Sequence, residues 1–261
     1  MRQFTAEYLE STRAGMWEDS LDALGYLDIE SRERILDVGA GTGELTRVLR
    51  DQTAGTVVAL DADRGLLGHV ASPRLLGDAT QLPFAEGSFD LVVCQALLVN
   101  LPDPAAVIEE FARVSTDRVA VIEPDNSAVA IESTVDTEAA LARRARESYL
   151  AGVETDAALG AVPDLFRSAG LDDITVDRYD HERSIESPYS ERALEGARRK
   201  ASGTGIDDDR ETILAGDTSV ESFEDLREQW RAMGREVIEQ MQDGRYRQRE
   251  VVPFYVTSGR V

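Results

Sequence analysis

Between residues 34 and 123, five short apolar runs alternate with segments of helical pattern, and this alternation constrains the fold more than any other feature. The runs occupy 34–38, 56–60, 74–76, 89–94 and 118–123. Strands buried on both faces of a sheet have continuous apolar sequences, and strands that alternate with helices form parallel sheets. The sequence therefore predicts an α/β protein with a doubly wound, mostly parallel sheet.

The rest of the chain adds two strands and several helices to this pattern. The further strands are expected at 173–176 and 251–256, and helical patterns occupy 5–24, 44–50, 64–70, 104–114, 138–150, 163–169, 192–200 and 223–241. Roughly 60 residues separate the last two strands, which is too long for a plain loop and predicts a helical insertion. The predicted domains are an N-terminal helical cover (1–30), a Rossmann-like core (31–183 and 250–261, with 127–160 partly cap) and a helical cap insertion (184–249).

The charge of the chain is strongly acidic, with 50 Asp and Glu against 28 Lys and Arg and a formal net charge of −22. Lys200 is the only lysine, so every other basic side chain is arginine or histidine. This composition resembles that of salt-adapted, halophilic proteins, in which salt screens the repulsion between surface carboxylates. An acidic surface also argues against a nucleic-acid partner, because it repels the phosphate backbone.

The cysteine and histidine content and the hydropathy of the chain predict its cellular compartment and argue against disulfides, metal sites and membrane segments. Cys94 is the only cysteine, so no intrachain disulfide can form, and its apolar run predicts a buried, inert thiol. The two histidines, His69 and His181, lie far apart in sequence, so we expect no metal site. No apolar run approaches the ~18–20 residues that span a bilayer. Together with the absence of a signal-peptide pattern, these features predict a cytoplasmic protein without a membrane segment.

A glycine-rich turn, Gly-Ala-Gly-Thr-Gly at 39–43, joins the first apolar run to the helix that starts at Glu44. Glycines let the backbone approach a ligand closely because no Cβ intervenes. The dinucleotide pattern G-x-G-x-x-G fails because position 44 is glutamate, and no Gly-Lys-Ser/Thr follows as in a phosphate loop. The turn predicts a ligand-binding loop of another kind.

Two aspartates follow the second and third apolar runs. Asp61 ends the second run about 20 residues after Gly39, the spacing at which an acid meets ribose hydroxyls in dinucleotide folds. Asp78 lies in the segment 77–84, directly after the third run. Both could instead be ordinary turn residues.

The motifs together resemble the class I S-adenosylmethionine-dependent methyltransferases, in particular the small-molecule type. The resemblance rests on Asp-Val-Gly-Ala-Gly-Thr-Gly at 37–43, Leu-Pro-Phe at 82–84 and Phe-Asp at 89–90. It implies a seven-stranded sheet in the order 3-2-1-4-5-7-6, with strand seven antiparallel, and helical cap insertions.

The resemblance also implies which residues bind S-adenosylmethionine. The turn would line the methionine part, a buried aspartate would organise the turn, and the acids after strands two and three would hold ribose and adenine. An arginine in the N-terminal helix could pair with the cofactor carboxylate. The residues concerned are Arg13, Asp37, Gly39, Ala40, Gly41, Asp61, Ala62, Asp78, Ala79 and Gln95.

No catalytic residue is assigned, and Asn100 is the one candidate. It stands where many relatives show histidine, and an amide cannot act as a base near neutral pH, so it would orient the acceptor or cap its loop. The candidates for lining the acceptor site lie at or after strands four and five, in the N-terminal helix and in the cap. They are Trp17, Asn100, Glu123, Asn126, Tyr149 and Tyr189. For the aromatic residues, ordinary packing is the alternative.

The predicted function is in-line transfer of a methyl group from S-adenosylmethionine to a small or medium-sized acceptor, with no metal. Such a displacement needs proximity and alignment, and a base only where the acceptor must lose a proton. The alternatives are a non-catalytic S-adenosylmethionine-binding sensor or partner subunit and an NAD(P)-dependent oxidoreductase, against which Glu44 and Asp78 count. A methyltransferase acting on RNA or protein is a further alternative, although no basic, aromatic-interleaved patch supports RNA. The sequence makes no prediction of oligomeric state.

Overall fold

The computed structural model describes residues 5–6, 9, 16–17, 20–153 and 162–261. Its contacts divide the chain into two compact units, which we describe separately. Unit 1 comprises Met1–Pro124, Thr155–Tyr179 and Phe254–Val261, and unit 2 comprises Asp125–Glu154 and Asp180–Pro253.

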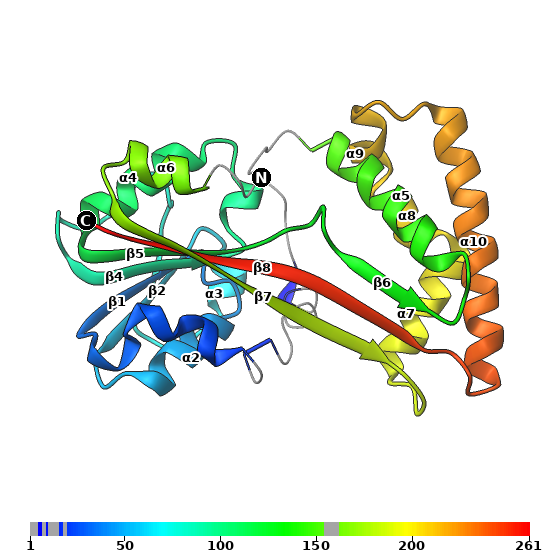
Figure 1. Ribbon diagram of the computed structural model, residues 1–261, viewed down its shortest axis with the longest axis horizontal. Helices are drawn as coiled ribbons and strands as arrows, with labels where there is room; N and C mark the ends of the chain where they lie inside the picture. The colour runs from blue at the N-terminus through cyan, green and yellow to red at the C-terminus, as the bar shows by residue number, and fades with distance from the viewer. Residues whose placement is uncertain (1–4, 7–8, 10–15, 18–19, 154–161) are drawn as a thin grey trace. The chain divides into compact units, whose positions relative to one another are not determined.

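The sheet has the strand order β3-β2-β1-β4-β5-β8-β6, and β7 pairs with β8 (Figure 1). The first five strands are parallel: β1 (Arg34–Val38), β2 (Thr56–Asp61), β3 (Arg74–Leu76), β4 (Phe89–Gln95) and β5 (Ser115–Pro124). Strand β8 (Gln248–Arg260) is antiparallel to β5, with Ile122 opposite Val256. The predicted order, with the seventh expected strand antiparallel between the fifth and sixth, is confirmed.

The C-terminal strands are longer than their apolar runs. Strand β7 (Asp172–Ile185) has 14 residues and β8 has 13, whereas four and six residues were expected from the sequence. A third strand, β6 (Ala130–Ser133), pairs with β8 and was not predicted. Most residues of β6 and β7 are exposed or half-buried, so their sequences contain many polar side chains and no continuous apolar run.

Helices cover both faces of the sheet in unit 1. Helices α4 (Pro104–Val114) and α6 (Val162–Ser168) lie together on one face, and α2 (Glu44–Gln52) lies on the other (Figure 1). Helix α3 (Arg64–Leu67) is shorter than the predicted 64–70. The larger apolar core is formed by side chains from the strands and from α4 and α6, including Leu36, Val92, Cys94, Ile108, Phe111 and Phe166.

The N-terminal region differs from the single helix predicted over 5–24. From residue 21 the chain forms a 3-10 helix (Leu21–Leu27), and after Asp28, whose φ is +57°, a second one (Ile29–Ser31). A left-handed residue cannot continue a right-handed helix, so the turn breaks there. Half of the predicted helix, including Arg13, lies outside the described residues.

Unit 2 is mainly helical and has a core of its own. Its helices are α5 (Glu138–Ala151), α7 (Glu191–Ser202), α8 (Thr204–Asp207), α9 (Arg210–Ala215) and α10 (Val220–Gln242). The core includes Phe223, Leu226, Met233, Val237 and Tyr246. Helices α7 and α10 approach closely at Gly234, where a Cβ would lie 2.3 Å from the backbone nitrogen of Ala201.

A polar cluster of Ser133, Glu138, Lys200, Tyr246 and Gln248, here called the Glu138 cluster, lies within unit 2. The Glu138 carboxylate is buried and accepts hydrogen bonds from the Tyr246 hydroxyl at 3.0 and 2.9 Å and from the Ser133 hydroxyl at 2.6 Å. It also forms an ion pair with the ammonium of Lys200, the only lysine of the chain. Buried charges are normally paired in this way, so the cluster fixes α5, α7 and β6 to one another.

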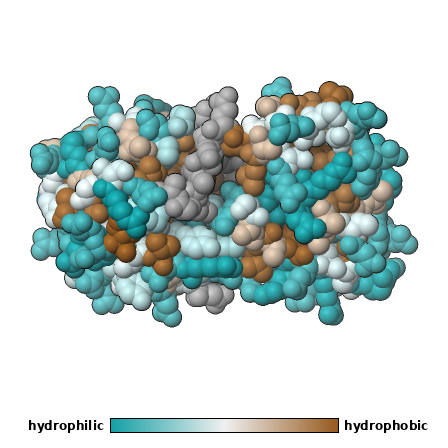
Figure 2. Space-filling model, turned by 45° about the horizontal axis from the view of Figure 1, so that its top comes forward, coloured by the Kyte–Doolittle hydropathy of each residue, from teal (hydrophilic) through white to brown (hydrophobic). Residues whose placement is uncertain are grey.

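On the face shown in Figure 2, hydrophilic side chains cover most of the area and apolar ones form separate small patches. Among the helices of the described residues, none combines the length and the apolar character needed to cross a bilayer.

Candidate functional site

The glycine-rich turn is bound to the end of strand β2. The N–H groups of Gly39 and Ala40 both donate to the carbonyl oxygen of Leu60, at 2.8 and 3.0 Å. Gly39, Gly41 and Gly43 have φ values of +70°, +55° and +83°, which L-residues with side chains rarely adopt. The three glycines are therefore required by the path of the turn itself, which folds back on the carboxyl end of the neighbouring strand.

Asp37 fixes the start of the helix that follows the turn. Its side chain is 1% exposed, and Oδ2 accepts a 2.5 Å hydrogen bond from the hydroxyl of Thr46 on α2. A carboxylate accepting from a hydroxyl on the facing helix joins β1 to α2 across the turn. This geometry is compatible with the organising role expected for Asp37, which stays a prediction.

Asp61 holds the turn from the end of β2. One carboxylate oxygen, Oδ2, accepts the N–H of Gly41 at 2.7 Å, and Oδ1 accepts the N–H of Asp63 at 2.8 Å. The side chain is half-buried, and Ala62 beside it is exposed. Each carboxylate oxygen has two lone pairs, so Asp61 can accept hydroxyl donors from a ligand while it keeps both backbone contacts.

Asp78 lies next to Asp61 because β2 and β3 pair. Asp61 is opposite Leu76, and the N–H of Gly77 donates to the Asp61 carbonyl at 3.0 Å. The side chain of Asp78 is exposed. The backbone N–H and then the hydroxyl of Thr80, at 2.9 and 2.8 Å from Oδ1, hold the pKa of Asp78 below its usual value. Asp78 is therefore ionised at neutral pH, and Ala79 beside it is buried.

Gln95 ends strand β4, which adjoins β1 in the sheet. Its side chain is buried, and Nε2 lies 2.7 Å from the sulfur of Met16. The carboxyl ends of parallel strands share one edge of the sheet, where ligands bind in open α/β folds. The structure thus brings the turn at 39–43, Asp61, Asp78 and Gln95 to the same edge.

Comparison with known proteins agrees with this arrangement. Residues 36–121 match the family described as "Methyltransferase domain". This chain contains a methyltransferase domain at residues 36–121. The matched segment carries all four features at the sheet edge.

Proteins named as methyltransferases are among those similar to this chain. The demethylmenaquinone methyltransferase of Corynebacterium kroppenstedtii is 35% identical over 117 residues, which is 43% of this chain and 51% of that protein. The chain therefore spans about half the length, or less, of the curated relatives it matches. A solved structure from Bacillus halodurans has a TM-score of 0.52 at 14% identity, and the match covers 93% of this chain and 98% of that one. A phosphoethanolamine N-methyltransferase of Haemonchus contortus, solved with S-adenosylhomocysteine, has a TM-score of 0.53 at 17% identity, covering 99% of this chain and 58% of its own.

The segment after β4 in the methyltransferase domain contains Asn100, the catalytic candidate. Asn100 ends a short 3-10 helix (Leu98–Asn100), and its Nδ2 donates to the carbonyl oxygen of Ala96 at 2.9 Å. This contact corresponds to the loop-capping alternative raised by the sequence. A role of Asn100 toward an acceptor stays a prediction.

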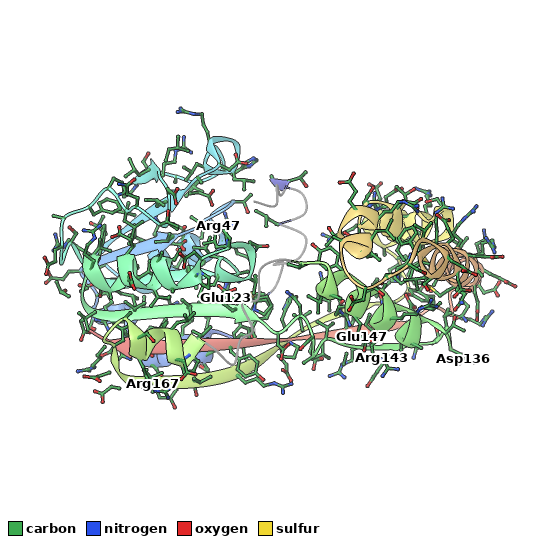
Figure 3. The ribbon with its side chains drawn as sticks, turned by 90° about the horizontal axis from the view of Figure 1, so that it is seen from above. Arg47, Glu123, Asp136, Arg143, Glu147 and Arg167 are labelled. Atoms are coloured by element: carbon green, nitrogen blue, oxygen red, sulfur yellow. The ribbon has the colours of Figure 1, made fainter. Side chains whose placement is uncertain are left out.

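Glu123, expected at the rim of the acceptor site, is buried with 1% of its side chain exposed. Its Oε1 accepts the N–H groups of Leu97 and Leu98, both at 2.9 Å, and Oε2 accepts that of Val99 at 3.3 Å. Figure 3 labels Glu123 at the end of β5. The Glu123 carboxylate thus binds backbone N–H groups of the loop that follows β4. Contact with an acceptor has no support in these hydrogen bonds and remains only a prediction.

Cys94 lies inside the domain and is not a nucleophile. The thiol is fully buried in β4. Burial, followed by the nearby carboxylates of Glu123 and Asp37, raises the pKa of Cys94 well above its usual value. Since the thiolate is the reactive form, the neutral thiol is inert at ordinary pH.

The remaining acceptor candidates lie in different surroundings. Trp17 is buried, with its ring centroid 5.6 Å from that of Tyr179 in unit 1. Tyr149 and Tyr189 pack on the core of unit 2, and the Tyr189 hydroxyl donates to the Tyr246 carbonyl at 3.0 Å. Asn126 is exposed in a turn after β5. The three aromatic residues therefore pack against other side chains, as the alternative interpretation expected. Their contact with an acceptor stays a prediction.

One residue, Thr46, and one role, that of Glu123 toward the loop after β4, were missed from the sequence. Thr46 is the partner of Asp37, and Glu123 is the acceptor for the loop after β4. For Glu123 a signal was present, because a charged residue that directly follows a continuous apolar run must find buried partners. Among the described residues there is no group of three His, Cys, Asp or Glu side chains that could hold a metal ion.

Proposed function

We propose that this protein is an S-adenosylmethionine-dependent methyltransferase that acts on a small or medium-sized acceptor. The observation that carries the proposal is the meeting of the glycine-rich turn, Asp61, Asp78 and Gln95 at one edge of the sheet, within the segment that matches the methyltransferase domain. The S-adenosylhomocysteine in the similar Haemonchus contortus enzyme supports the choice of cofactor.

The residues at this edge fit the polar groups of S-adenosylmethionine. Asp61 offers a half-buried carboxylate to the two ribose hydroxyls, and it already fixes the Gly41 N–H. Asp78 offers an ionised, exposed carboxylate to the adenine amino group. Ala62 and Ala79 would lie beside the adenine ring, and Gly39, Ala40 and Gln95 near the methionine part. The pairing of Arg13 with the cofactor carboxylate concerns a residue outside the described ones and stays a proposal. Hydrogen bonds to charged acceptors contribute about 1.5–3 kcal/mol each, so these two aspartates would account for much of the affinity.

When bound, the cofactor supplies a methyl group on a positively charged sulfur, which is an excellent leaving group. The chain has to hold this group and the acceptor in line and to keep water out. Asn100 donates to Ala96 and the Cys94 thiol is neutral, so neither acts as a base. We therefore propose an acceptor that needs no deprotonation by a side chain of the described edge.

The proposal of an acceptor class is supported by a smaller part of the chain than the proposal of the cofactor. The family match ends at residue 121, before unit 2 begins, so the demethylmenaquinone substrate of the curated relatives is not carried over. A small-molecule acceptor agrees with the net charge of −22, which disfavours nucleic acid. The cap role of 127–160 and 184–249, the N-terminal cover at 1–30 and a cytoplasmic location also remain proposals.

The test is calorimetric titration of the full chain in concentrated KCl, with S-adenosylhomocysteine and separately with NADH. Saturable binding of S-adenosylhomocysteine alone is expected. Binding of NADH alone would establish an oxidoreductase instead. A second step, with methyl-labelled cofactor and a mixture of small-molecule acceptors, separates enzyme from sensor: label transfer is expected, and binding without any transfer favours a non-catalytic subunit.

A further inference from the structure

The turn that follows β4, residues 96–100, is anchored from beneath by one buried carboxylate. Glu123 precedes the last residue of β5, and its two oxygens accept three consecutive backbone N–H groups, those of Leu97, Leu98 and Val99. Placing a carboxylate in a protein interior costs several kcal/mol unless hydrogen bonds replace its water shell. Three N–H donors do so here, which makes the turn and Glu123 depend on each other.

The backbone of this turn needs such an anchor. Ala96 has a φ of +49°, a left-handed conformation that costs a residue with a Cβ about 1–2 kcal/mol. Its N–H donates to the Ile122 carbonyl at 2.8 Å, and its own carbonyl accepts from Asn100. Strained residues persist only where their surroundings fix them. The end of β5 thus holds the turn at two places, through the carbonyl of Ile122 and the carboxylate of Glu123.

The turn at 96–100 also contacts the glycine-rich turn at 39–43. A Cβ on Gly39 would lie 2.8 Å from Cδ1 of Leu97 and 3.3 Å from its Cγ. The Leu97 side chain therefore packs directly on the Gly39 backbone, at the start of the segment that would bind the methionine part of the cofactor. Any shift of Leu97 opens or crowds this segment.

We propose that Glu123 is a positioning residue of the cofactor site: it fixes the turn at 96–100, and Leu97 of that turn sets the position of Gly39. The proposal rests on the proposed function for its effect on the cofactor, but the anchoring itself does not. Glu123 does not touch the cofactor in this account. A glutamine in its place keeps one acceptor oxygen and places an NH₂ group among N–H donors, so it satisfies the turn only in part.

Cys94 provides a built-in reporter of the turn. It is the only cysteine, it is fully buried, and its sulfur lies 3.9 Å from Oε1 of Glu123, two residues before Ala96. A thiol reagent reaches it only when this part of the domain opens. The rate of labelling under native conditions therefore measures local opening without any cofactor present.

The experiment compares Glu123→Leu, Glu123→Gln and Leu97→Ala with a matched control, Asp90→Asn. Asp90 also carries a carboxylate that accepts backbone N–H groups, from Glu33 at 2.7 Å and Arg34 at 3.1 Å, but it lies at the start of β4, at the opposite edge of the sheet. For each full-length variant in concentrated KCl we would measure the Cys94 labelling rate, the Kd for S-adenosylhomocysteine and the urea unfolding midpoint.

We expect Glu123→Leu to label at least about tenfold faster and to bind S-adenosylhomocysteine at least about tenfold more weakly, a change of ~1.4 kcal/mol in each case. Glu123→Gln should fall between this variant and the wild type, and it carries the test if Glu123→Leu does not fold. Leu97→Ala keeps the anchor but loses the contact with Gly39, so its Kd should rise while its labelling rate stays near that of the wild type. Asp90→Asn should lower the unfolding midpoint and leave Kd and labelling unchanged.

Two results separate the inference from the proposed function. Wild-type labelling rate and wild-type affinity in the folded Glu123 variants would overturn the inference. If the wild type itself binds no S-adenosylhomocysteine, the methyltransferase proposal fails, whereas faster labelling of the Glu123 variants would still support the anchoring of the turn.

Discussion

Replacing Asp61 by alanine tests the cofactor site at the residue that links its parts. The wild-type carboxylate accepts the N–H of Gly41 at 2.7 Å and that of Asp63 at 2.8 Å, and in the proposed complex it also accepts the ribose hydroxyls. Asp61→Ala removes the acceptor for both the turn and the ribose. The buried Gly41 N–H then loses its partner, so the turn has to shift before it can hold a ligand.

The expected size follows from these contacts. Loss of a charged acceptor from hydroxyl donors lowers the binding free energy by about 1–3 kcal/mol, which raises Kd roughly 5- to 150-fold. Asp61→Asn should lose less, because the amide oxygen can still accept the Gly41 N–H while the charge is gone. Both changes are measured by calorimetric titration with S-adenosylhomocysteine, with urea unfolding to confirm that each variant is folded.

Asp63→Ala is the matched control for this prediction. The Asp63 carboxylate accepts the N–H groups of Gly65 and Leu66 and so caps helix α3, two residues from Asp61. Its loss should cost about 1 kcal/mol of folding stability and leave Kd at the wild-type value. Wild-type affinity in a folded Asp61→Ala variant, or an equal loss in Asp63→Ala, would refute the reasoning.

Three further predictions concern other charged and buried groups. Asp78→Ala should raise the Kd for S-adenosylhomocysteine by a factor similar to that of Asp61→Ala, with little change in the unfolding midpoint because the side chain is exposed; unchanged affinity contradicts this. Lys200→Met leaves Glu138 buried without its cation and should lower the free energy of unfolding in urea by about 3–5 kcal/mol, whereas Arg198→Ala, in an exposed pair, should change it by less than about 0.5 kcal/mol. Burial, and then Glu138, raises the pKa of Tyr246 far above 10.0. The contribution of Tyr246 to the free energy of unfolding is therefore present below pH 10 and is lost as the pH rises further, at about 1.4 kcal/mol per pH unit. Tyr246→Phe should remove this pH dependence of stability, and an unchanged pH dependence in that variant would count against the prediction.

The sequence predicted strands β1, β2, β4 and β5 because their burial leaves mostly apolar runs, whereas the short strand β3 at the end of the sheet is exposed. Strand β1 and helix α4 begin and end where the patterns indicated, and the proline at position 104 follows the capping Asp103. Strand β6 and residues 177–185 of β7 were not predictable in this way. Their exposed positions carry polar side chains, and the pairing that defines them involves residues distant in sequence.

The approach of the glycine-rich turn to Asp61 and Asp78 was also predictable, since the carboxyl ends of parallel strands meet at one edge. The surroundings of Glu123 were not. Its partners are backbone N–H groups of a turn 24–26 residues earlier, which no side-chain pattern reveals. A left-handed conformation at Ala96 was equally invisible, because alanine is not the residue that such a conformation favours.

The central claim is that the loops at the carboxyl ends of β1, β2, β3 and β4 bind S-adenosylmethionine. Amide hydrogen exchange of the full chain in concentrated KCl, with and without saturating S-adenosylhomocysteine, tests it most directly. We predict slower exchange at 39–43, 61–63, 77–80 and 95–100, with α7 and α10 of unit 2 unchanged. Protection confined to other segments, or none in these four, would contradict the account.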